Sequence, residues 1–228
     1  MWNSPALTPD AQTLVVVTGE DDGDNWPYEQ ALVTLDASTL RPLQANKPHT
    51  QGPDLDFGTS PVVFHGSAGR TVAGATSKTG VFYAYFLDSV SSGPVWSRNL
   101  GVVIGMAPAY DSSFGPAGTL FVVGTTLGTA YTGGNAALYA LDPDTGGDVW
   151  PQVAVIGNAG NNLAIANRLI FVNTGATGLG VLDETNGAVL RSLVPANSGP
   201  AVSGVVVAEG AVYWVSGNFL NAWRPPGP

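Results

Sequence analysis

Short apolar runs alternate with turn-forming residues along almost the whole chain, and residues 138–150 show the pattern most clearly. They read Leu-Tyr-Ala-Leu-Asp-Pro-Asp-Thr-Gly-Gly-Asp-Val-Trp. The first four have the length and apolar character of a buried strand. The next six favour a tight turn, because their side chains bond their own backbone or they accept positive φ. Val149 and Trp150 then begin a return strand, so the stretch predicts a strand, a turn and a second strand.

Weaker copies of this stretch recur at residues 32–43, 82–96 and 179–190 and, in shortened form, at 219–223. An aspartate marks the corner in each of four copies: Asp36, Asp88, Asp142 and Asp183. These corners are roughly 40 to 55 residues apart, which is the period of a β-propeller blade. Each repeat is a small antiparallel sheet that must stack on its neighbours around an axis. The pattern therefore predicts an all-β propeller of four-stranded antiparallel blades with little helix.

The repeats amount to about four to five blade units over residues 1–223, followed by a Pro-rich tail at 224–228 that cannot form a sheet strand. Closed propellers typically have about four to eight blades. Because the chain starts inside a repeat, we expect an incomplete propeller, the carboxy-terminal portion of a larger one. A small closed ring of five blades is the alternative.

Composition supports this fold and narrows the function. The chain is 44% hydrophobic and 11% charged, with 30 Gly and 17 Pro, which suits short strands and turns. A net charge of -9 argues against binding nucleic acid, whose phosphates would be repelled. Zero Cys excludes disulfides, zinc-thiolate sites and covalently attached c-type haem within this chain. The chain also shows no apolar run long enough to cross a bilayer and no signal peptide.

Residues 138–150 resemble the tryptophan-docking repeat of the pyrroloquinoline quinone (PQQ) propellers, a repeat that non-enzymatic outer-membrane assembly scaffolds also carry. A narrower resemblance lies in the order of four segments, at residues 2–6, 17–19, 52–61 and 77–84. Their order is similar to that in the quinoprotein alcohol dehydrogenases, and closest to the polyvinyl alcohol dehydrogenase branch. This resemblance covers roughly the first 110 residues, including 105–107, and beyond them the chain matches only as generic repeats.

The resemblance implies a PQQ- and calcium-dependent oxidation of alcohols. It places Asp54 as the catalytic base and Lys78 as the cation that hydrogen-bonds the quinone oxygens. Trp2 corresponds to the indole that stacks under the planar cofactor. Asp56 is two positions after Asp54, on the same face if the segment is a strand, and paired carboxylates suit a divalent cation. Glu20 stands where the family has an Asn or Asp near the metal, so it is a weaker metal ligand candidate.

The resemblance also implies partners and a compartment. The substrate would be a small or polymeric alcohol, and the protein would be periplasmic or extracellular. Because the chain lacks a haem-binding Cys-x-x-Cys-His segment, electrons would leave to an external acceptor. We further expect Asp54, Asp56 and Lys78 to converge near the propeller axis on one face, because the aspartates open the inner strand of their blade and Lys78 begins a later strand.

Each candidate residue also has a plain structural interpretation. The Asp54–Asp56 pair suits a solvent-facing turn, Lys78 suits an exposed hairpin, and Trp2 suits edge packing. Glu20 lies in an acidic loop that lacks the spacing of a calcium loop, which favours a solvated loop. Trp96, Trp150 and Trp223 are expected at the same repeat position, where each would pack between blades. The family's upstream blades, which carry further metal and cofactor ligands, have no counterpart here, so a non-catalytic scaffold with a protein partner stands as the alternative function.

Overall fold

Five antiparallel sheets make up the part of the chain that the structure describes. The computed structural model describes residues 3–19, 26–49, 52–101, 106–125, 136–152, 154–157, 163–174, 178–194 and 204–225. Within these residues the one helical element is a short 3₁₀ turn, Val90–Ser92. The expectation of an all-β fold with little helix is confirmed.

Four sheets have four strands each and the last has three. The first sheet contains β1 (Ala6–Leu7), β2 (Thr13–Val17), β3 (Leu32–Asp36) and β4 (Pro42–Asn46). The second contains β5 (Val62–His65), β6 (Thr71–Thr76), β7 (Val81–Phe86) and β8 (Trp96–Asn99). The third contains β9 (Ala109–Asp111), β10 (Thr119–Thr125), β11 (Ala136–Leu141) and β12 (Ala154–Gly157). The fourth contains β13 (Ala164–Ala166), β14 (Leu169–Asn173), β15 (Leu179–Asp183) and β16 (Val189–Leu193). The fifth contains β17 (Val206–Ala208), β18 (Ala211–Ser216) and β19 (Phe219–Trp223).

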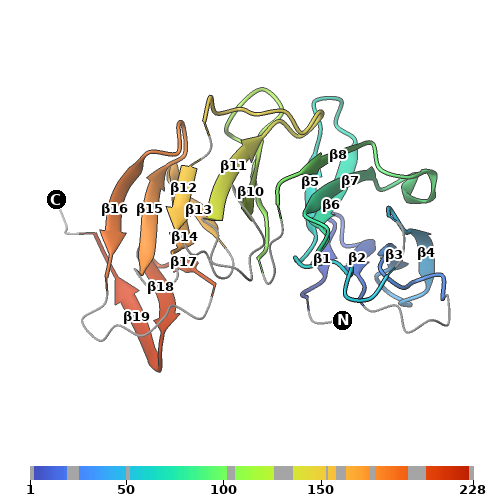
Figure 1. The fold of residues 1–228 in the computed structure, drawn as a ribbon, viewed down its shortest axis with the longest axis horizontal. Helices are drawn as coiled ribbons and strands as arrows, with labels where there is room; N and C mark the ends of the chain where they lie inside the picture. Colours follow the sequence, from blue (N-terminus) through green and yellow to red (C-terminus); the bar gives the residue numbers. More distant parts are fainter. Residues whose placement is uncertain are drawn as a thin grey trace.

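The five sheets follow one another along an open arc, so each is a propeller blade, numbered here 1 to 5 in chain order (Figure 1). Within each blade the strands pair in sequence order, or in its reverse, as a simple antiparallel meander. The first strands of successive blades contact each other: β1 with β5, β5 with β9, β9 with β13, and β13 with β17. Blades 1 and 5 lie at opposite ends of the arc (Figure 1). This arrangement is that of an incomplete β-propeller.

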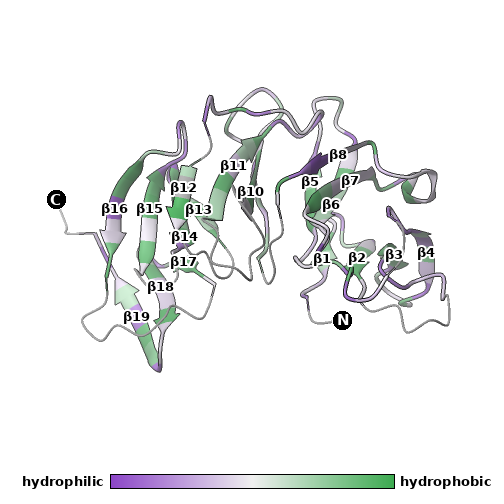
Figure 2. Ribbon diagram, in the orientation of Figure 1, coloured by the Kyte–Doolittle hydropathy of each residue, from purple (hydrophilic) through white to green (hydrophobic). Residues whose placement is uncertain are grey.

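Apolar residues from the facing sides of neighbouring blades fill the four spaces between them. Phe57 and Tyr85 are central between blades 1 and 2, and Phe82 and Leu120 between blades 2 and 3. Phe121 packs between blades 3 and 4, and clusters of the same kind join blade 4 to blade 5. Figure 2 shows this as apolar colour along the middle strands, with hydrophilic residues on the outer strands β4 and β8. Burial between sheets therefore drives the stacking.

The predicted aspartate corners lie at equivalent places, where the third strand of each blade ends. Asp142 Oδ1 accepts hydrogen bonds from the backbone N–H groups of Asp144 and Thr145, at 3.0 and 2.9 Å. Asp36 and Asp183 bond their own turns in the same manner. At Asp88 the chain instead enters the 3₁₀ turn, and the carboxylate pairs with Arg70. Three corners are therefore built by one local rule, and the fourth is a variation of it.

The residue eight positions after each corner aspartate reaches the corner of the next blade. Trp96 Nε1 donates to Pro143 O at 2.9 Å, and Trp150 Nε1 donates to Glu184 O at 3.0 Å. In blade 1 the equivalent residue is Gln44, whose side-chain Nε2 donates to Leu87 O at 3.3 Å. In blade 4 it is Arg191, whose guanidinium lies 5.8 Å from the centre of the Trp223 ring. We call these four side chains the latch residues.

Trp223 corrects one expectation. It was expected at the same repeat position as Trp96 and Trp150, but it ends the third strand of its blade and therefore receives a latch residue. It is also only half-buried, whereas Trp150 is 3% exposed. Across the described residues, no helix has the length and hydropathy to span a membrane.

Candidate functional site

Asp54, Asp56 and Lys78 lie together at one end of the strands of blade 2. The two aspartates precede β5, and Lys78 lies in the turn between β6 and β7. The aspartates were expected on the first strand of the blade and Lys78 at the start of a later strand. This is wrong, since β5 begins only at Val62 and β7 only at Val81. Asp54 instead has a φ of 59°, a turn conformation that is uncommon outside glycine. Both carboxylates therefore reach the same lysine because the backbone turns at Asp54, and not because side chains alternate along a strand.

The Lys78 ammonium lies between the two carboxylates. Its Nζ contacts Asp54 Oδ1 directly and lies 2.6 Å from Asp56 Oδ1. The Lys78 side chain is 12% exposed and that of Asp56 2%, whereas that of Asp54 is 63% exposed. Burial alone would lower the pKa of Lys78, but hydrogen bonds and charge attraction from both aspartates outweigh it and raise the pKa. Lys78 therefore remains an ammonium.

Hydrogen bonds from the backbone and from one buried side chain hold this cluster in place. The Lys78 N–H donates to Asp56 O at 2.8 Å, which ties the β6–β7 turn to the segment before β5. Gly19 packs against Asp56, since a Cβ at this glycine would lie 3.4 Å from Asp56 Oδ2. Gln30 is fully buried, and its amide Oε1 accepts from the Gly52 N–H at 3.2 Å while its Nε2 donates to Gly52 O. Blade 1 thus fixes the loop that carries the aspartates of blade 2.

The described residues do not by themselves form a calcium site. Calcium takes about six to eight oxygen ligands, and the cluster offers two carboxylates that already share an ammonium. In the described part of the chain, no group of three or more His, Cys, Asp or Glu residues could hold a metal ion. Glu20, expected as a metal ligand, and Trp2, expected under the cofactor, both lie outside the described residues. The structure therefore brings together three of the five predicted site residues.

A second carboxylate pair, which the sequence did not indicate, lies between blades 3 and 4. Glu184 is fully buried, and its Oε2 lies 3.4 Å from Arg168 Nε. Burial, with Asp111 beside it, raises the pKa of Glu184 to about 7. Burial also acts on Asp111, but the neighbouring Glu184 and the hydrogen bond from the Ser113 N–H outweigh it and lower the pKa of Asp111. The pair therefore shares one proton, held on Glu184.

The residues that were missed carry little signal in the sequence. Glu184 follows a corner aspartate in a run of turn formers, which reads as solvent-exposed. Its burial comes from Asp111 and neighbouring residues of another blade, so no local pattern marks it. Gln30 has a φ of 45° and directly precedes the apolar run of β3, but a single glutamine is not informative. The Asp54, Asp56 and Lys78 cluster was found because its segments resemble those of a family.

Comparisons with known proteins agree on the fold. No protein-family model matches the sequence, and neither does any curated protein. Among solved structures, the chain is similar to BamB from Moraxella catarrhalis, with 15% identity and a TM-score of 0.64. It is also similar to the quinohemoprotein alcohol dehydrogenase from Comamonas testosteroni (16%, TM-score 0.62) and to ADHIIG from Pseudomonas putida HK5 (15%, 0.62).

These matches cover nearly the whole chain but only part of each known structure. They include 97% of this chain and 58% of BamB, 94% and 44% for the Comamonas enzyme, and 98% and 44% for the Pseudomonas enzyme. At such low identity they show the fold alone, and the expectation of a PQQ-type propeller fold is confirmed. The chain spans about half the length of the structures it matches.

Proposed function

We propose that the Asp54, Asp56 and Lys78 cluster is part of an alcohol-oxidising site that uses PQQ, so that this chain is one portion of a quinoprotein alcohol dehydrogenase propeller. One observation carries the proposal: a buried ammonium shared between an exposed and a buried carboxylate. The fold does not decide the matter, because the similar structures include both dehydrogenases and BamB.

Each side chain of the cluster has a separate role in this proposal. Asp54 is exposed, so its carboxylate can accept the proton of a substrate hydroxyl. Asp56 is buried and holds the lysine in place, which makes it a positioning residue. Lys78 keeps its charge and can donate a hydrogen bond to an electron-rich oxygen of substrate or cofactor. PQQ, when bound, would supply the acceptor for the hydride.

The charge of the cluster indicates what else the site requires. Two carboxylates and one ammonium leave it with one net negative charge, and PQQ is itself an anion. A bound cation would therefore favour PQQ binding, and calcium is the cation that the resemblance implies. Its remaining oxygen ligands must come from outside the described residues, with Glu20 as one candidate.

Isothermal titration of the chain with PQQ, with and without calcium, tests the proposal without needing turnover. We expect PQQ to bind when calcium is present and Lys78→Gln to weaken it by roughly tenfold or more, the effect of losing a charge-assisted hydrogen bond. Asp10→Asn, at the opposite end of the blade strands, is the matched control and should leave PQQ affinity unchanged. Equal affinity of wild type and Lys78→Gln would remove the reason for assigning this site to PQQ.

A second candidate function, a protein-binding propeller without catalysis, is favoured by a different observation. Six of the large exposed hydrophobic side chains belong to blades 4 and 5: Val189, Leu190, Val194, Val206, Phe219 and Leu220. Leu220 is 73% exposed. Exposed apolar patches commonly mark interaction surfaces. This function becomes the better account if PQQ does not bind the wild-type chain with calcium present.

A further inference from the structure

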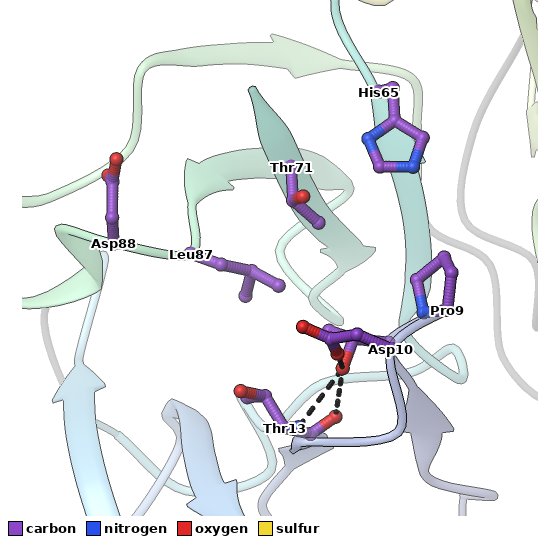
Figure 3. Close-up of a pocket in the computed structure, with 8 residues that line it drawn as sticks. Pro9, Asp10, Thr13, His65, Thr71, Leu87 and Asp88 are labelled. Carbon is purple, nitrogen blue, oxygen red and sulfur yellow. Dashed lines mark hydrogen bonds between the residues drawn. The ribbon is translucent and has the colours of Figure 1, made fainter. Parts of the chain in front are cut away.

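We propose a second ligand site, for a small organic cation of the alkylammonium type, in a pocket between blades 1 and 2. The pocket has a volume of about 440 Å³ and is lined by Thr8, Pro9, Asp10, Thr13, His65, Thr71, Leu87 and Asp88 (Figure 3). This volume lies within the range of about 300–1,000 Å³ that is usual for small-ligand sites.

The pocket is distinct from the Lys78 cluster. Its residues come from the β1–β2 turn, from the two ends of the β5–β6 turn and from the end of β7. The Lys78 cluster lies before β5 and in the β6–β7 turn, at the other end of the same strands. A ligand in one site therefore cannot touch the other, and the two can be tested independently.

Asp10 is the charged group that a cationic ligand would meet. Its Oδ1 accepts hydrogen bonds from Thr8 Oγ1 at 2.6 Å and from the Gln12 N–H at 3.1 Å. In the described part of the chain, both of these residues bond the carboxylate through Oδ1, which leaves Oδ2 for a ligand. Thr8 also bonds Thr13 twice, so the turn is rigid before any ligand arrives. The hydrogen bond from Thr8 lowers the pKa of Asp10, so the carboxylate stays charged.

On the opposite wall of the pocket, a carboxylate and a guanidinium neutralise each other. Asp88 is paired with Arg70 at 2.5 Å, and the Arg70 guanidinium lies 3.4 Å from the centre of the Phe86 ring. That charge is therefore already matched, while the lining residues include no Lys or Arg. In a chain of net charge -9, an acidic pocket of this kind attracts cations and repels anions.

The rest of the lining selects an ammonium on an apolar stem. Leu87 packs against the apolar core between blades 1 and 2 and extends into the pocket, and Pro9 lies across the pocket from it, near His65 (Figure 3). A short alkyl chain can lie between Leu87 and Pro9 while its ammonium donates to Asp10. Thr71 and His65 offer further polar atoms around the same space. A bare metal ion would find few oxygen ligands, since the lining has only two carboxylates and one of them is paired.

Calorimetric titration with n-butylammonium chloride at low ionic strength tests the site, with 1-butanol as the neutral isostere. We expect the ammonium to bind roughly tenfold or more tightly than the alcohol, as expected when a neutral hydrogen bond replaces a charge-assisted one. Asp10→Asn keeps the Oδ1 acceptor of the turn and should remove this preference. Asp54→Asn, in the Lys78 cluster, is the matched control and should leave butylammonium affinity unchanged.

Three outcomes would overturn the proposal: equal binding of the ammonium and the alcohol, unchanged binding in Asp10→Asn, or a calcium titration that reproduces the ammonium response. A measurement on the wild type does not depend on how Asp10→Asn folds. In NMR spectra of the complex, the butyl protons should show nuclear Overhauser effects to the Leu87 methyl groups. Contacts to other methyl groups alone would place the ligand elsewhere and overturn the assignment.

Discussion

Two carboxylate pairs in this propeller have similar components but differ in protonation. Each pair combines one buried and one more exposed carboxylate with a single basic side chain. At the Lys78 cluster the ammonium touches both carboxylates, and it is itself nearly buried. Between blades 3 and 4, Arg168 is 51% exposed, lies 3.4 Å from Glu184, and packs its guanidinium over Phe114. The Lys78 ammonium stays charged, whereas Glu184 keeps a proton below about pH 7.

The difference shows that proximity to a base does not decide the charge of a buried carboxylate. A close cation contact must offset the cost of removing the carboxylate from water. The Lys78 ammonium lies 2.6 Å from the buried Asp56, whereas the half-exposed Arg168 lies 3.4 Å from Glu184. The Glu184 pair therefore suits a response to pH, and under the proposed function the Lys78 cluster suits proton acceptance by Asp54.

The largest expected effect comes from removing the indole that packs beside the Glu184 pair, between blades 3 and 4. Trp150 is 3% exposed, contacts Phe121 and donates to Glu184 O. Trp150→Ala should lower the free energy of unfolding by about 3–5 kcal/mol because it leaves a large cavity. Trp223→Ala, at a half-buried indole, is the control and should cost clearly less in the same denaturant titration. Equal losses for both would show that the junction between blades 3 and 4 is not specially dependent on Trp150.

The next substitution tests the contrast between the two cations directly. Lys78→Met should lower the free energy of unfolding by about 3 kcal/mol, because it leaves the buried carboxyl group of Asp56 without the ammonium that it contacts. Arg168→Met should cost less than about 1 kcal/mol, since Arg168 is half exposed and Glu184 can stay protonated. Chemical denaturation at pH 7 measures both. A larger loss for Arg168→Met than for Lys78→Met would reverse the comparison.

The pH dependence of stability sharpens the same comparison. The pKa of Glu184 in the folded chain, about 7, lies above the ordinary value of 4.5. The folded chain therefore holds a proton that the unfolded chain has lost between these values. The stabilising contribution is complete below about pH 4.5 and is lost as the pH rises through about 7.

Glu184→Gln should abolish this dependence. Between pH 4.5 and 8 the stability of wild type should fall relative to Glu184→Gln by roughly 3 kcal/mol. The aspartates of lowered pKa, such as Asp36 at about 2, affect stability at lower pH and are common to both proteins, so they cancel in the difference. A constant difference across this range would mean that Glu184 is not protonated in the folded chain.

The smallest expected effect concerns Asp54. Its side chain is 63% exposed, so Asp54→Asn should change the free energy of unfolding by less than about 1 kcal/mol. Under the proposed function, the same substitution removes the proton acceptor and should reduce alcohol oxidation by roughly 100-fold or more. Thermal melts and a dye-linked oxidation assay with added PQQ and calcium separate the two effects. A large loss of stability would assign Asp54 to the fold instead of the chemistry.

Much of the fold is readable from the sequence because its rules are local. Asp142 and Asp183 bond residues two or three positions away, so the same few letters produce the same corner each time. The tryptophan latch residues are recognisable for the same reason. Gln44 and Arg191 are not, because they occupy the latch position with a different chemistry, a hydrogen-bonding amide and a cation over a ring.

The candidate site is predictable only in part. The grouping of Asp54, Asp56 and Lys78 followed from segment order, although the backbone that creates it is a turn with positive φ and not a strand. The burial of Glu184 could not be predicted, because it depends on Asp111 from the neighbouring blade. Similarly, the pocket at Asp10 joins residues from two blades that are more than 50 positions apart.

The latch residues also define how this molecule could be cut and recombined. Each latch lies in the fourth strand of one blade or, for Trp150, just before it, while its acceptor is the corner of the next, as with Trp96 and Pro143. A chimera joined in the loop between two sheets would therefore separate every latch at the seam from its acceptor. A junction placed just after a corner, before the fourth strand, keeps each latch on the same side of the seam as its acceptor. The exchangeable module runs from one latch residue through the next corner, offset from the blade itself, and a designer should copy Trp96 together with residues 97–147 as one unit.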